Sequence, residues 1–96
     1  MRKYCDSLTA YARAVTRPVA VGSVVIGGGN PVRIQSMTNT DTNDTEASAA
    51  QVRRIAGAGG EIVRLTAQGR REAANLAAIR ARLREEGCSV PLVADI

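Results

Sequence analysis

The sequence contains no tryptophan, no phenylalanine and no histidine, and its only aromatic residues are two tyrosines. Each aromatic side chain would bury ~150–250 Å², so a core without them must be built from small aliphatic residues. The missing histidines exclude a histidine-based metal site and a His–Asp relay within these 96 residues. Two tyrosines supply few aromatic rings for stacking on bases, so we do not expect a nucleic-acid partner.

Cysteine is scarce, and Cys5 and Cys88 stand far apart in the sequence. Neither has the spacing of a zinc site or a redox pair, so we expect two unpaired thiols in a reducing cytosol. No apolar run is long enough to cross a bilayer, and the first residues lack the apolar region of a signal peptide. We therefore expect a cytoplasmic protein with no membrane partner.

The charge is modestly basic, with 13 Lys and Arg against 9 Asp and Glu. All but Lys3 of the basic residues are arginines. The guanidinium fork matches phosphate and carboxylate groups well. Most of these arginines, however, fall on expected helix faces that water covers.

Three short apolar segments end in polar residues, and two helix-like segments separate them. We expect a β-hairpin around Gly22-Ser23, then parallel strands with intervening helices. The expected strands run from Val32 to about Ser36 or Met37, over Glu61–Leu65 and over Leu92–Ala94, and the helices run from near Asp44 or Thr45 to Gly57 and from about Arg70 to Glu86.

The spacing of the strands predicts the fold class, which is α/β. Strand centres near Ile34, Val63 and Val93 lie 29 and 30 residues apart, and a right-handed β–α crossover needs roughly 30. We expect an N-terminal β-hairpin followed by the first βαβαβ segment of a TIM (β/α)₈ barrel. A doubly wound sheet has the same local pattern. The hairpin favours the barrel, because a short hairpin can plug the bottom of one. Because the sequence stops at the third strand, we expect the front part of a larger enzyme.

Parallel strands gather their carboxyl ends at one edge of the sheet, where ligands bind in α/β folds. Arg64 lies there inside an apolar strand, so either a carboxylate or an anionic ligand must neutralise it. Strand alternation excludes Glu61 as its same-face neighbour and leaves Asp95. Asp95 itself has three open roles: base, metal ligand or hydroxyl acceptor. The hydrogen-bonding run from Gln35 to Thr40 is either a second part of this site or a loop that caps its own backbone.

Three motifs together resemble the N-terminal part of the 4-hydroxy-3-methylbut-2-enyl diphosphate synthase family: VGSVVIGGGNPVRIQSMTNTDT, EIVRLTAQG and PLVADI. The block TAQGRREA resembles the long, three-domain form. The resemblance implies that residues 1–96 are a truncated part of a TIM-barrel substrate domain. It also implies that the remaining barrel, an inserted domain and a C-terminal domain with a [4Fe–4S] cluster are absent.

The resemblance further implies an oxidoreductase of non-mevalonate isoprenoid biosynthesis. Such an enzyme reductively converts 2-C-methyl-D-erythritol 2,4-cyclodiphosphate to 4-hydroxy-3-methylbut-2-enyl diphosphate, with flavodoxin or ferredoxin as electron donor. Arg64 matches a family arginine that contacts the diphosphate. Asp95 matches the strand-three aspartate and is the candidate catalytic residue, while Gln35, Met37, Thr38 and Asn39 map onto the strand end that lines the pocket.

No residue here matches a cluster ligand or another metal ligand of the family, so we expect the isolated 96 residues to be inactive. Because strand edges would be exposed, we also expect them to self-associate, by edge pairing or by swapping an element. Two other interpretations stay open. One is a pterin-binding barrel similar to dihydropteroate synthase, and the other is a non-enzymatic α/β interaction module.

Overall fold

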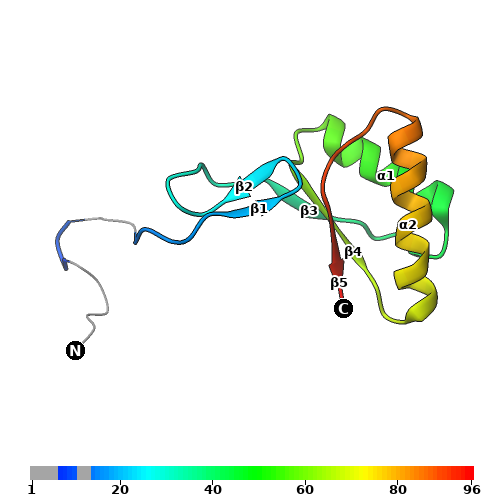
Figure 1. The fold of residues 1–96 in the computed structure, drawn as a ribbon, viewed down its shortest axis with the longest axis horizontal. Coiled ribbons are helices and arrows are strands. Elements are labelled where there is room, and N and C mark those ends of the chain that lie inside the picture. The colour runs from blue at the N-terminus through cyan, green and yellow to red at the C-terminus, as the bar shows by residue number, and fades with distance from the viewer. Residues whose placement is uncertain (1–6, 11–13) are drawn as a thin grey trace.

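A computed structural model of the chain describes residues 7–10 and 14–96. Within these residues the chain forms a hairpin, then three strands that alternate with two helices (Figure 1). The elements are β1 (Val19–Val21), β2 (Val24–Ile26), β3 (Gln35–Met37), α1 (Thr45–Gly57), β4 (Ile62–Thr66), α2 (Arg70–Glu85) and β5 (Leu92–Asp95).

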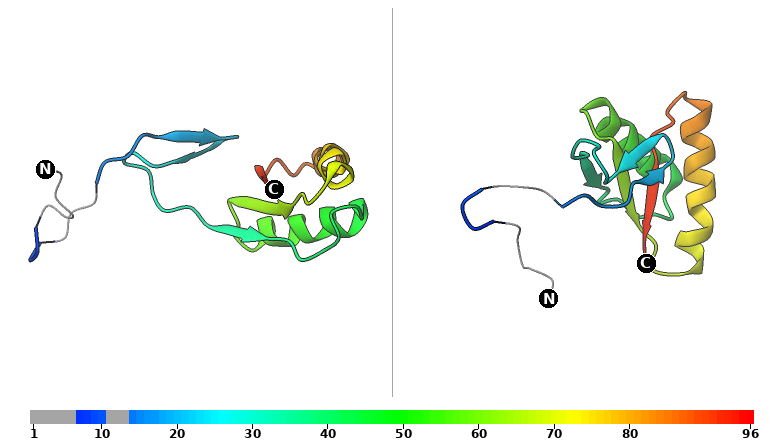
Figure 2. Two further views of the ribbon diagram at one scale, coloured as in Figure 1. Left: turned by 90° about the horizontal axis from the view of Figure 1, so that it is seen from below. Right: turned by 60° about the vertical axis from the view of Figure 1, so that its left-hand side comes forward.

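Strands β1 and β2 form the antiparallel hairpin. The other three strands form a parallel sheet in the order β3-β4-β5, with α1 and α2 as the crossovers. Both helices lie on the same side of this sheet (Figure 2). This arrangement confirms the expected βαβαβ segment after a hairpin. The carboxyl ends of all three strands consequently meet at one edge, which we call the carboxyl edge; the opposite one is the amino edge.

The core lies between the two helices and one face of the sheet. In β4, Val63 and Leu65 are fully buried against the helices, whereas Arg64 between them is half-buried. Strand alternation explains this pattern, because successive side chains point to opposite faces. The buried cluster holds only small and medium aliphatic residues: Ala49, Val52, Val63, Leu65, Ile79 and Leu83. The face that carries Arg64 is not covered by a helix of the described chain.

A local cap begins α1, and ion pairs hold the two helices together. The Asp44 side chain accepts a hydrogen bond from the Ala47 N–H at 3.1 Å and so caps α1, as expected. Ion pairs then join the helices to each other. Arg53 Nε lies 2.7 Å from Glu86 Oε2, and Arg82 Nη2 lies 3.3 Å from Glu46 Oε2. Arg82 thus links α2 back to α1, although the sequence predicts that most arginines lie on helix faces that water covers.

The hairpin contacts the amino edge of the sheet. Arg33 joins the two parts, because its Nε donates to the Val25 carbonyl at 2.9 Å while its Nη1 lies 3.0 Å from Glu61 Oε2. Glu61 immediately precedes β4. The hairpin thus lies at the end of the strands where a plug was expected.

The first parallel strand is shorter than the sequence indicates. It begins at Gln35 instead of Val32, and Val32 and Ile34 are 74% and 59% exposed. The register explains the difference. Gln35 lies opposite Ile62, so residues 32–34 would have to pair with the glycine-containing turn that follows α1. At Ile34 the backbone pairing is already irregular: its carbonyl accepts the Glu61 N–H at 2.8 Å, while its own N–H donates to the Glu61 carboxylate at 3.1 Å.

No helix in the described part of the chain combines the length and the apolar character that a bilayer span requires.

Candidate functional site

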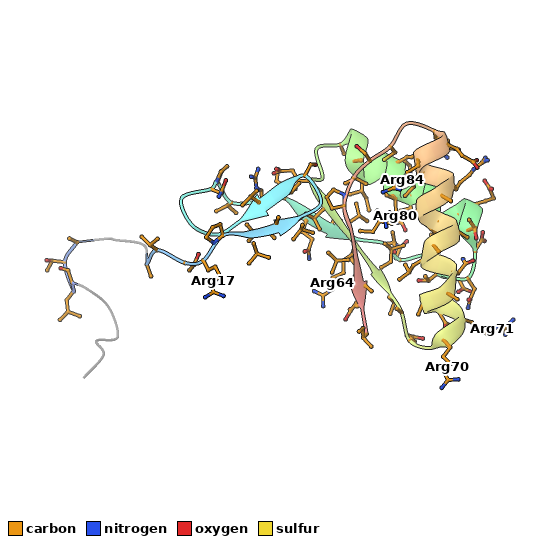
Figure 3. All side chains as sticks on the ribbon, viewed as in Figure 1. Arg17, Arg64, Arg70, Arg71, Arg80 and Arg84 are labelled. Atoms are coloured by element: carbon orange, nitrogen blue, oxygen red, sulfur yellow. The ribbon has the colours of Figure 1, made fainter. Side chains whose placement is uncertain are left out.

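Arg64 and Asp95 form an ion pair on the uncovered face of the sheet. Arg64 Nη2 lies 3.2 Å from Asp95 Oδ1, and the two side chains are 43% and 34% exposed. Arg64 is in register with Val93, and Thr66 with Asp95, so all four side chains share one face. The sequence predicts that either a carboxylate or an anionic ligand neutralises Arg64. The structure shows that the Asp95 carboxylate contacts it. Figure 3 shows Arg64 beside β5, near the carboxyl edge.

Arg64 keeps unused hydrogen-bonding capacity in this arrangement. Its Nε is shielded from solvent and has no hydrogen-bond partner within the described residues. A guanidinium offers five N–H donors, and one carboxylate oxygen satisfies few of them. An anion with several oxygens is the kind of ligand that could complete the coordination of this group.

Two further predicted residues lie on the same face as Arg64. Met37 is directly opposite Arg64 in the register of β3 and β4, and Gln35 is opposite Ile62. Met37 is 42% exposed. The structure thus brings Gln35, Met37, Arg64 and Asp95 onto one surface, which we call the open face.

Thr38 and Asn39 are placed differently. Thr38 is 5% exposed, and its hydroxyl is buried without a partner in the described chain. The side chain of Asn39 turns to α1, where Gln51 Nε2 donates to Asn39 Oδ1 at 2.7 Å. The Asn39 N–H donates in turn to Gln51 Oε1 at 2.9 Å. Neither side chain therefore reaches the open face in this conformation.

The rest of the loop after β3 largely satisfies its own polar groups. Thr40 and Ser48 share a hydrogen bond of 2.9 Å, and the Ser48 hydroxyl donates to the Asp41 carbonyl. The Thr42 hydroxyl donates to the Thr66 carbonyl at 2.6 Å, which ties this loop to the end of β4. For these residues the self-capping loop is the better interpretation, as the sequence allowed.

A polar cleft of about 410 Å³ lies at the carboxyl edge between the loops that follow β3 and β4. Thr66, Gln68 and Glu72 line one side of it. Sequence reasoning did not select Gln68, although its position just after a parallel strand is the signal that could have found it.

The glycine run that follows β2 forms a turn. Gly27 and Gly28 have φ of 84° and 61°, values that favour glycine. The Asn30 N–H closes the turn by donating to the Gly27 carbonyl at 3.1 Å. This run leads into β3 and not into a helix, so it is not a phosphate loop.

Known proteins resemble almost the whole chain. The family model described as the GcpE TIM-barrel domain matches residues 16–96. A 4-hydroxy-3-methylbut-2-en-1-yl diphosphate synthase (flavodoxin) of Akkermansia muciniphila is 56% identical over 93 residues, which is 97% of this chain and 16% of that protein. The protein of the same name from Bacteroides fragilis is 59% identical over 86 residues, 90% of this chain and 14% of its own length. The chain thus spans only 14–16% of the length of these curated relatives.

Proposed function

We propose, from the premise that this chain belongs to the GcpE family, that it forms the N-terminal part of the substrate-binding barrel of a 4-hydroxy-3-methylbut-2-enyl diphosphate synthase. Family membership confirms the resemblance first seen in the motifs. It also supports the TIM-barrel interpretation of the βαβαβ segment. The relatives' extra length supports our proposal that the remaining strands, an inserted domain and a C-terminal cluster domain belong to the complete enzyme.

The complete enzyme would convert 2-C-methyl-D-erythritol 2,4-cyclodiphosphate to 4-hydroxy-3-methylbut-2-enyl diphosphate. The observation that carries this assignment is the position of Arg64 on the open face with an unpartnered Nε. A cyclic diphosphate presents several anionic oxygens in a compact ring, and a guanidinium fork binds such oxygens with short, charge-assisted hydrogen bonds. The family match gives no comparable support to a pterin-binding barrel or to an interaction module.

We assign separate roles to the residues near Arg64. Arg64 binds the diphosphate, while Met37 and Gln35 form the adjacent wall on the open face. Asp95 orients the Arg64 guanidinium through the ion pair of 3.2 Å and is our candidate for contact with the reacting part of the substrate. Thr38 and Asn39 need a rearrangement of the loop after β3 before they can contact a ligand.

An iron–sulfur cluster, which the family uses to supply electrons, does not fit the described residues. Among them Cys88 is the one free thiol, and no group of three or more His, Cys, Asp or Glu side chains gathers that could hold a metal. Cys5 lies outside the described residues. A cubane cluster needs four ligands at one place. We therefore assign the [4Fe–4S] cluster to another part of the enzyme.

The relatives are named as flavodoxin-dependent enzymes, which supports flavodoxin, with ferredoxin as the alternative, as the electron donor of this protein. The unpaired thiol of Cys88 suits the reducing cytoplasm. We also propose that the 96-residue chain alone is inactive and self-associates through its exposed strand edges.

A titration of the ¹⁵N-labelled chain with the cyclic diphosphate tests the proposed site. We expect saturable chemical-shift changes at the backbone amides of Met37, Arg64 and Asp95, which share the open face. Amides of the hairpin around Gly22 should not move, because the hairpin lies at the amino edge. Shifts confined to residues away from the open face would refute the assignment.

A further inference from the structure

A second cleft, of about 440 Å³, lies at the amino edge of the sheet, away from the proposed substrate site. Its walls come from the hairpin turn, the last turns of α2 and the segment that leads into β5. The lining residues that matter here are Gly22, Ser23, Arg80, Arg84, Ser89 and Pro91. Its volume falls within the ~300–1,000 Å³ typical of small-molecule sites.

One wall of this amino-edge cleft depends on a close contact that only glycine permits. Gly22 has φ of 59°, and a Cβ at this position would lie 3.0 Å from Pro91 Cγ and 3.3 Å from Pro91 Cβ. Any side chain would therefore strain the backbone and crowd the Pro91 ring, which would have to yield by a few tenths of an ångström. The packing of the turn against Pro91 consequently fixes the shape of the cleft.

The opposite wall carries two arginines, Arg80 and Arg84, for which no carboxylate partner lies among residues 7–10 and 14–96. Arg80 and Arg84 stand one helical turn apart, and Figure 3 shows both side chains leaving α2 on the side of the segment before β5. Neither forms an ion pair with a carboxylate of the described chain, whereas Arg82 between them contacts Glu46, Glu85 and Glu86. Like charges at this spacing destabilise a helix.

The available carboxylates near the end of α2 are already engaged. Glu86 lies 2.7 Å from Arg53 and 3.2 Å from Arg82, so it is not free to serve Arg80 or Arg84. The negative end of the α2 dipole favours cations in this region. It does not, however, explain why two guanidiniums line one cleft opposite a turn held in place by glycine.

We propose that the amino-edge cleft binds a small anion that bears phosphate groups. Arg80 and Arg84 hold the phosphate oxygens, because paired guanidinium forks bind such oxygens in a bidentate manner. The hydroxyls of Ser23 and Ser89 line the same cleft and supply further donors. The size of the cleft and these hydroxyls favour a small molecule over an acidic protein segment.

Inorganic pyrophosphate is the probe that tests this proposal, titrated into the ¹⁵N-labelled chain at low ionic strength. We expect saturable shifts at the amides of Ser23 and Ser89. R80A/R84A should weaken the affinity measured from the shifts of these two amides at least about tenfold, through the loss of two charge-assisted contacts. R70A/R71A is the matched control, because it removes two exposed arginines from the other end of α2 (Figure 3) and should leave the affinity within about twofold.

Two further variants separate this site from the proposed substrate site and from non-specific attraction. R64A should leave the pyrophosphate affinity of the amino-edge cleft unchanged. The amino-edge site and the proposed substrate site at Arg64 can therefore be refuted independently of each other. R80K/R84K keeps the charge and loses the forks, and it should bind with intermediate affinity. Equal losses in R80A/R84A and R70A/R71A, no saturation at millimolar pyrophosphate, or tighter binding of a glutamate-rich peptide would each overturn the proposal.

Discussion

Arg64 and Asp95 reach toward each other from neighbouring parallel strands, with 3.2 Å between Nη2 and Oδ1. Because the side chains are 43% and 34% exposed, water screens their attraction, and exposed pairs of this kind contribute only about 0.2–1 kcal/mol. The pair therefore orients Arg64 without holding it strongly. An anionic ligand on the open face can compete for the guanidinium at little cost in stability.

A double-mutant cycle measures how strongly the two residues are coupled. We expect R64A, D95A and the double variant to give a coupling free energy below about 1 kcal/mol in urea unfolding. A coupling of about 3 kcal/mol or more would contradict this expectation, because that magnitude belongs to a buried pair with a structural role.

Two glycines near the end of α1 should respond to alanine in opposite ways. At Gly60 a Cβ would meet Ile55 Cγ2 at 2.6 Å and the Ile55 carbonyl oxygen at 2.9 Å, whereas at Gly57 it would meet nothing within 4 Å. We expect G60A to lower the free energy of unfolding by about 1–3 kcal/mol through overpacking.

G57A is the matched control for that substitution. It should leave the stability unchanged or raise it by up to about 1 kcal/mol, because alanine favours the helix and restricts the unfolded chain. Thermal or urea unfolding of the two variants provides the comparison. If G60A proved as stable as G57A, the close contact between Gly60 and Ile55 would be wrong.

The elements that depend on local signals were predictable from the sequence. One such signal is the spacing of 29 and 30 residues between Ile34, Val63 and Val93, which indicates parallel strands joined by helices. Another is Asp44, which marks the start of α1. The start of β3 was not predictable in this way. It depends on which residues of β4 lie opposite, and Val32 has the same β propensity whether or not a partner strand exists.

The candidate site was predictable in part for the same reason. Strand alternation is local, so it left Asp95 as a possible carboxylate partner of Arg64 and excluded Glu61, which pairs with Arg33. The contact between Asn39 and Gln51 joins a loop to a helix twelve residues later. No periodicity in the sequence reports such a contact, because it depends on how α1 packs beside the loop.

Self-association of the 96-residue chain should depend on the outer edge of β5. The Pro91 and Asp95 carbonyls accept hydrogen bonds from Val63 and Ala67 of the β4 side. By alternation, the backbone groups of Ala94 face away from β4, toward an edge that no described strand covers. Exposed edges of this kind promote pairing between copies.

Replacing Ala94 with proline tests this dependence, since proline removes the outward N–H without touching the ladder to β4. We expect light scattering to show concentration-dependent oligomers for the unmodified chain and for A94S, which retains the N–H, and a shift toward monomer for A94P. Monomers at all concentrations in the unmodified chain would refute self-association, and oligomers unchanged by A94P would exclude the β5 edge.

The affinity of Arg64 variants for 2-C-methyl-D-erythritol 2,4-cyclodiphosphate tests the central claim most directly, measured by calorimetry in an enzyme that carries this segment within a complete barrel. Losing a charge-assisted contact to phosphate costs roughly 1.5–3 kcal/mol, so R64A should bind about 10–150-fold more weakly. R70A, which removes an exposed arginine of α2 outside the open face, should bind as the unmodified enzyme does. Equal affinities of R64A and R70A would contradict the assignment of Arg64 to the diphosphate.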